Sequence, residues 1–95
     1  MPRIIWSLLA EYDRDLHADY LAVHSPRAAA TLGEAIVRAV EGLLGFPDIG
    51  RPGRVPGTRE LIVVRTPYLV ICERAGETIH ILRVLHGAQQ WPPPD

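Results

Sequence analysis

The sequence predicts an α+β fold in which a hairpin of two helices packs on a small, mainly antiparallel sheet. Two neighbouring segments in the first half have the apolar spacing of helices. Three short runs rich in β-branched residues follow in the second half, separated by tight turns. With an apolar run at the start, the predicted order is β-α-α-β-β-β. The helices must cover one face of the sheet, because a single layer cannot bury a core.

The first strand is predicted at Arg3–Trp6, where β-branched and aromatic residues cluster. Ser7 follows as an N-cap, because its hydroxyl can accept a hydrogen bond from an unpaired backbone N–H. A helix is then expected from Leu8 to about His24. Its apolar residues recur in steps of three and four, which indicates one apolar face. That face comprises Leu9, Tyr12, Leu16, Tyr20 and Val23.

A second helix is predicted from Pro26 to about Leu44. Ser25 suits its N-cap, and Pro26 suits the first helical position, where a missing N–H costs nothing. Gly45 is a natural stop. The break between the two helices is short, so we expect them to form an antiparallel hairpin. The expected buried face comprises Ala29, Leu32, Ile36, Val40, Leu43 and Leu44.

The segment from Phe46 to Thr58 is predicted to be a loop, since it contains three prolines and three glycines. Three strands follow at Arg59–Val64, Tyr68–Glu73 and Thr78–His86. The turns between them are short, which predicts an antiparallel meander.

Length and composition bound the answer further. We expect residues 1–95 to form one domain, with residues 92–95 as a flexible tail. A single cysteine excludes an internal disulfide. No apolar run approaches the roughly 20 residues that a membrane span needs, and the start lacks the features of a signal peptide. These observations predict a cytoplasmic protein that does not enter a membrane.

The charges are unusual in kind and uneven in placement. All ten basic residues are arginine, and six of them lie in residues 49–95. The first half is acidic. Any cationic contact is therefore made by a planar guanidinium group, which suits carboxylate and phosphate partners. The asymmetry indicates a basic working face on the C-terminal half.

The last predicted strand contains the residues most suited to chemistry. On a regular strand His80 and His86 share one face, and Arg83 lies on the other with Ile79 and Ile81. The histidines suit acid–base work on RNA or structural hydrogen bonding. We expect Arg83 to lie at the sheet end or to pair with a carboxylate, because an unpaired buried arginine is costly.

Other polar residues predict no site. His17 and His24 are expected at the surface or at an edge, and their spacing is too wide for one metal ion. Asp13 and Asp15 point apart on a helix, so they form no carboxylate pair. Neither a metal nor a cofactor is expected.

Several stretches resemble a known family. They are Pro56–Leu61, Pro67–Ile71, Phe46–Arg51 and above all the ending Ile81–Pro92, which reads Ile-Leu-Arg-Val-Leu-His-Gly-Ala-Gln-Gln-Trp-Pro. Together they resemble the RelE/ParE superfamily of toxins from type II toxin–antitoxin systems, and the ending resembles its ParE-type or plasmid-stabilisation branch. The resemblance implies a β-α-α-β-β-β toxin domain that a cognate antitoxin neutralises.

The resemblance leaves the target open. RelE-like members cut mRNA on the ribosome, whereas ParE-like members poison DNA gyrase. Nuclease members tend to carry basic residues in the strand that here reads Tyr68–Ile71, and Arg with Tyr or His where this chain has Gly87–Gln89. Both departures favour gyrase. The alternatives are a ribosome-dependent mRNA endonuclease with His86 and Arg83 in its site, and an inactive remnant that only binds antitoxin.

Two sets of contact residues are expected from this interpretation. Contacts with gyrase or DNA are assigned to Arg51, Arg54, Arg59 and Trp91. The apolar stripe on the first helix is expected to be partly core and partly an antitoxin-docking groove, formed by Leu9, Tyr12, Leu16 and Tyr20. An antitoxin helix or extended segment would wrap across the hairpin and sheet.

Overall fold

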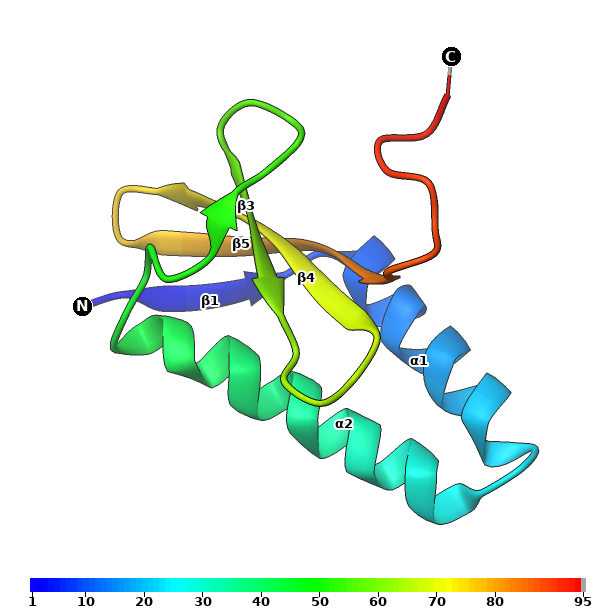
Figure 1. Cartoon of the computed structure of the whole chain (residues 1–95). Helices are drawn as coiled ribbons and strands as arrows, with labels where there is room; N and C mark the ends of the chain where they lie inside the picture. Colours follow the sequence, from blue (N-terminus) through cyan, green and yellow to red (C-terminus); the bar gives the residue numbers. More distant parts are fainter. Residues whose placement is uncertain (95) are drawn as a thin grey trace.

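The computed structural model describes residues 1–94 and contains a five-stranded mixed sheet with two helices (Figure 1). The elements are β1 (Arg3–Trp6), α1 (Leu8–Ala22), α2 (Pro26–Glu41), a short 3₁₀ helix η1 (Gly42–Leu44), β2 (Arg51–Pro52), β3 (Thr58–Ile62), β4 (Tyr68–Ala75) and β5 (Thr78–His86). The strand order is β1-β5-β4-β3-β2, and β1 is the strand that pairs in parallel. The predicted fold class is confirmed.

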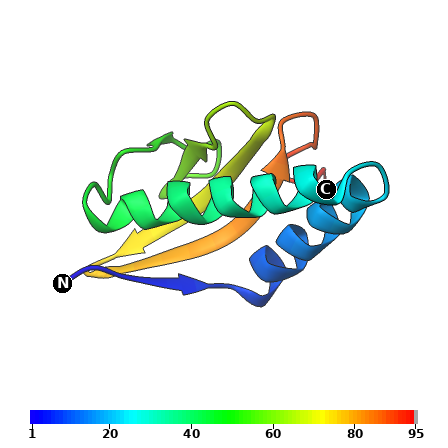
Figure 2. The same cartoon turned by 90° about the horizontal axis from the view of Figure 1, so that it is seen from below.

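Both helices lie on the same face of the sheet, as the second view makes clear (Figure 2). Their N-caps are those expected from the sequence: Ser7 Oγ accepts from the backbone N–H of Ala10, and Ser25 Oγ accepts from that of Ala28. The helices are joined by a tight break, so they pack as a hairpin. The sheet is left with one covered face and one open face.

The core lies between the sheet and the hairpin. Helix α2 contributes most of the helical side, through Leu32, Ile36, Val40 and η1 residue Leu43. The sheet contributes Val63, Tyr68, Val70, Cys72, Ile79, Ile81 and Val84. Predicted core residue Leu44 is instead 45% exposed, because α2 ends at Glu41 and the tighter 3₁₀ turn rotates Leu44 away.

The predicted apolar face of α1 is not the buried one. All five stripe residues are exposed, namely Leu9, Tyr12, Leu16, Tyr20 and Val23. The helix instead turns Ala10, Asp13 and His17 toward the sheet. The expectation that the stripe belongs partly to the core is therefore wrong. It leaves a row of large apolar side chains facing solvent.

The predicted loop contains a short strand. Arg51 and Pro52 pair with Arg59 and Glu60 of β3, and form the far edge of the sheet. A proline is tolerated there because an edge strand has no neighbour that needs its missing N–H.

A β-bulge in β5 changes which residues share a face. Ile71 of β4 pairs with Arg83, whereas the next residue, Cys72, pairs with Ile81, so Leu82 has no partner. One extra residue reverses the alternation of side chains beyond it. His80 and His86 therefore lie on opposite faces, contrary to the prediction. Arg83 shares the open face with Ile71, not with Ile79 and Ile81.

Candidate functional site

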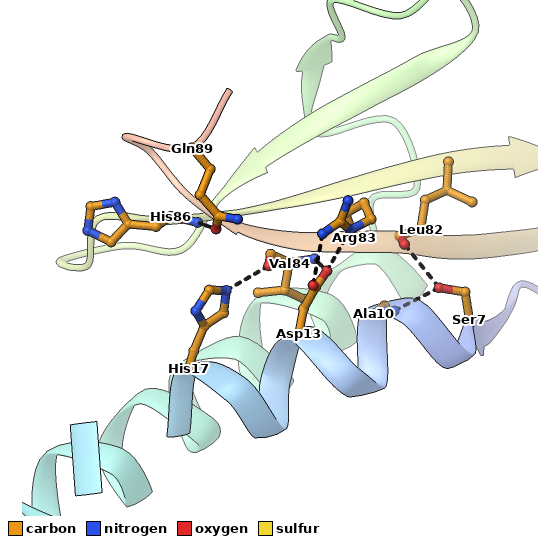
Figure 3. Close-up of polar contacts among 9 residues, drawn as sticks. All are labelled: Ser7, Ala10, Asp13, His17, Leu82, Arg83, Val84, His86 and Gln89. Carbon is orange, nitrogen blue, oxygen red and sulfur yellow. Dashed lines mark hydrogen bonds and ion pairs between the residues drawn. The ribbon is translucent and has the colours of Figure 1, made fainter. Parts of the chain in front are cut away.

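The open edge of β5 is the first feature that organises the site. Strand β1 pairs with β5 only as far as Ile81. Beyond that point side chains from the start of α1 take over its hydrogen bonds (Figure 3). Ser7 Oγ donates to the carbonyl of Leu82 at 3.0 Å, and His17 Nε2 donates to that of Val84 at 2.8 Å. These polar groups replace a neighbouring strand.

Asp13 lies at the centre of this edge. Its carboxylate accepts from the backbone N–H of Val84 at 2.9 Å and from the Nε and Nη2 atoms of Arg83 at 2.8 and 3.0 Å. The side chain of Asp13 is 4% exposed and that of Arg83 is 19% exposed. The hydrogen bonds to Asp13 raise the pKa of Arg83 above its usual value, despite its partial burial. The expectation that Arg83 pairs with a carboxylate is confirmed.

His17 was predicted at the surface, and that prediction is wrong. Its ring is buried, with its centroid 4.7 Å from that of Tyr68. The sequence held one signal of this arrangement. Asp13 and His17 are four residues apart and Ala10 is three before Asp13, so all three share one helix face.

The structure does not bring Arg83 and His86 together. They lie on opposite faces of β5, and Arg83 is fully engaged by Asp13. His86 is engaged as well: its Nδ1 accepts from the backbone N–H of Ala88 at 3.0 Å, and its ring stands edge-on to Tyr68. The chain segment that follows is fastened by the side chain of Gln89, which accepts from the His86 N–H.

The open face carries a second polar cluster around Glu60. Its carboxylate accepts from Arg51 Nη2 at 3.0 Å and from the backbone N–H of Arg54 at 3.0 Å. The Glu60 side chain is 1% exposed, while those of Arg51 and Arg54 are about half exposed, at 53% and 51%. Two guanidinium groups surround one buried carboxylate, so the cluster keeps an outward positive charge.

Trp91 adjoins this cluster. Arg54 Nη1 donates to the Trp91 carbonyl at 3.2 Å, and the Arg83 guanidinium lies 5.8 Å from the centre of its ring. Three of the four predicted target-binding residues, Arg51, Arg54 and Trp91, are thus neighbours. Arg59 is separate: it pairs with Cys72 on the helix-covered face and approaches Asp48 at 3.8 Å.

The pKa of Glu60 gives a prediction for stability. Burial acts to raise that pKa, but the hydrogen bonds and charges of Arg54 and Arg51 outweigh burial and lower it below 4.5. The charged form therefore stabilises the fold above pH 4.5, and this contribution is lost as pH falls through the lower folded-state value. We expect Glu60→Gln to cost about 1–2 kcal/mol at pH 7 and progressively less in acid.

Urea unfolding of the wild type and of Glu60→Gln between pH 7 and pH 3 checks this. A difference that stays constant across that range would show that the charge of Glu60 does not contribute.

Residues 1–94 contain no helix long and apolar enough to cross a membrane. Across the same part of the chain, no three His, Cys, Asp or Glu side chains gather in a way that could hold a metal ion. The site is therefore described by its two polar clusters and by the exposed stripe on α1.

Comparison with known proteins decides the family. Residues 4–91 match the family model described as the ParE toxin of the type II toxin–antitoxin system parDE. The chain belongs to the ParE toxin family. This ParE-family toxin is 41% identical over 90 residues to a putative toxin, Y4kP, of Sinorhizobium fredii, across 95% of this chain and 93% of that one.

Two further relatives place this ParE-family toxin in the wider superfamily. Toxin RelE2 of Caulobacter vibrioides is 32% identical over 89 residues, across 94% of this chain and 99% of that one. The solved chromosomal ParDE toxin–antitoxin system from P. aeruginosa superposes with a TM-score of 0.82 at 31% identity, across 90% of this chain and 96% of that one. The protein is thus a type II toxin of the RelE/ParE superfamily, and such a toxin implies a cognate antitoxin.

Proposed function

We propose that this ParE-family toxin stops growth by binding DNA gyrase, and that it does not cleave RNA. The observation that carries the proposal is the state of Arg83 and His86. A nuclease needs a free cation beside its acid–base residue, to stabilise charge that develops on the phosphate. Here the cation is neutralised by Asp13 and lies on the opposite face from His86.

The proposed contact surface for gyrase or its DNA is the open-face cluster of Arg51, Arg54 and Trp91. The two arginines are half exposed and outnumber the carboxylate they share. Guanidinium groups of this kind pair well with phosphate or carboxylate oxygens, and a neighbouring tryptophan adds apolar contact area. Arg59, on the other face, is proposed as a peripheral contact. Gyrase acts in the cytoplasm, so the proposal includes a cytoplasmic location.

The alternative is a ribosome-dependent mRNA endonuclease. One observation favours it: a relative that is 32% identical carries the name toxin RelE2. In that case ribosome and mRNA replace gyrase as partners, and His86 and Arg83 act in the site. A third possibility, an inactive remnant that binds only antitoxin, predicts no growth defect when the chain is expressed alone.

A paired substitution tests the gyrase surface without orphaning a buried charge. The double variant Arg51→Gln/Glu60→Gln removes both partners of one ion pair, which costs less than removing either alone. If Arg51 contacts the target, inhibition of gyrase supercoiling should require about 10-fold more of this variant. The matched control is Arg38→Gln, which removes an exposed arginine from α2 on the other side of the sheet.

Wild type and control should inhibit supercoiling within about 2-fold of each other, since surface changes outside a contact have small effects. Equal potency of the double variant and the control would remove Arg51 from the proposed surface.

We further propose that the antitoxin covers the stripe Leu9, Tyr12, Leu16 and Tyr20 on α1. Tyr12 is 60% exposed and Tyr20 is 69% exposed. A row of apolar side chains at helical spacing is suited to an amphipathic helix or an extended apolar segment from a partner. Such a row on a monomer marks an interaction site.

A further inference from the structure

A deep hollow continues from the end of the apolar stripe. It has a volume of about 520 Å³ and lies between the end of α1, the start of α2, the β3–β4 turn and the end of β5. Tyr20, the last stripe residue proposed for antitoxin docking, forms one wall. Leu32, Pro67 and Tyr68 supply further apolar surface. The volume is within the range of pockets that hold ligands or side chains.

Two arginines stand at this hollow, Arg27 from α2 and Arg65 from the β3–β4 turn. Within residues 1–94 neither makes an ion pair, although most other arginines of the chain do. Both are exposed. The other titratable group of the hollow beside the tyrosines is His86. The hollow therefore combines an apolar interior with positive charge and has no acid of its own to balance it.

Arg65 also has an unusual backbone. Its φ is 66°, and it is the one residue other than glycine with positive φ in residues 1–94. Glycine or asparagine adopts this conformation readily, whereas arginine adopts it at a cost. Residues kept in a disfavoured conformation concentrate at binding sites. The arginine at this position is thus better explained by what its side chain contacts than by the turn.

We propose that this hollow receives one large apolar side chain of the antitoxin, and that an acidic residue beside that side chain pairs with Arg27 and Arg65. The inference rests on the proposed docking of the antitoxin along the stripe, which Tyr20 connects to the hollow. Charge complementarity selects the occupant: two unpaired guanidinium groups favour an acidic segment. They disfavour a second copy of this chain docked through the same positive face.

The test uses the protein encoded by the neighbouring reading frame as the antitoxin, with Arg65→Gly, Arg27→Gln and the double variant. Arg65→Gly suits the backbone of the turn, so it should unfold at the same temperature as wild type or higher. The double variant should bind this antitoxin about 10- to 100-fold more weakly, with a smaller loss of affinity as salt is raised. Arg38→Gln, at another exposed position of α2, should bind as wild type does.

In cells the double variant should still arrest growth, and co-expression of the antitoxin should no longer restore growth fully. Wild-type affinity of the double variant would overturn the inference. The failure of the wider proposal looks different, because then Tyr12→Glu on the stripe would also bind normally. A change in self-association of the double variant, without a change in antitoxin affinity, would assign the hollow to a second copy and also overturn the inference.

Discussion

Asp13→Ala is expected to destabilise the fold by about 3 kcal/mol, the largest effect of any polar substitution considered. The change removes three hydrogen bonds at once, two from Arg83 and one from the backbone N–H of Val84. It leaves a mostly buried guanidinium and a buried edge N–H without partners. Breaking a buried pair from one side costs about 3–5 kcal/mol, and the partial exposure of Arg83 places this case at the lower end.

Urea unfolding measures this effect, with Asp15→Ala as the matched control. Asp15 lies two residues further along α1 and is exposed. Arg83→Met and the double variant complete a cycle in which the double variant should be more stable than the sum of the two losses predicts. A loss for Asp13→Ala within about 0.5 kcal/mol of the Asp15→Ala value would show that the buried pair does not support the edge of β5.

Tyr12→Glu is expected to weaken antitoxin binding by about 100-fold or more while the fold loses less than about 1 kcal/mol. Tyr12 is 60% exposed in the middle of the stripe, so the core does not depend on it. A carboxylate at that position would have to be buried, unpaired, against an apolar partner surface.

Calorimetric titration with the antitoxin, alongside thermal unfolding of the free toxin, separates the two effects. Ala22→Glu is the control, because it adds the same charge to an exposed position of α1 outside the stripe. If both variants bind equally well, the stripe is not the docking surface. If Tyr12→Glu unfolds, the stripe is core, contrary to the structure.

Much of the fold could be predicted from the sequence because the signals were local. The N-caps Ser7 and Ser25 and the bounds of β1 and β5 are as expected. The burial of α1 was not predictable in the same way. Its periodicity showed that one face is apolar, but periodicity does not say whether the molecule's own sheet or another protein covers that face.

The buried face of α1 was missed for a physical reason. Asp13 and His17 are polar residues that a sequence pattern assigns to solvent. They are buried because β1 stops at Ile81 and leaves backbone groups of β5 that need partners. This demand arises only once the strands are paired, so it is not visible along the chain.

The candidate site shows the same limit. A period of two places His80 and His86 on one face, and a single unpaired residue, Leu82, separates them. The bulge depends on the register of β4 against β5, which no local pattern specifies. The gathering of Arg51, Arg54 and Trp91 likewise depends on β2, whose proline argued against a strand.

The central claim is that this toxin acts on gyrase and not on translated mRNA. The most direct measurement adds the purified chain to two reactions side by side: gyrase supercoiling of relaxed plasmid, and translation of a defined mRNA on purified ribosomes. The account predicts loss of supercoiling, reversed by antitoxin, with the mRNA intact. Unimpaired supercoiling together with cuts in the translated mRNA that Asp13-paired Arg83 and His86 are needed to make would contradict it.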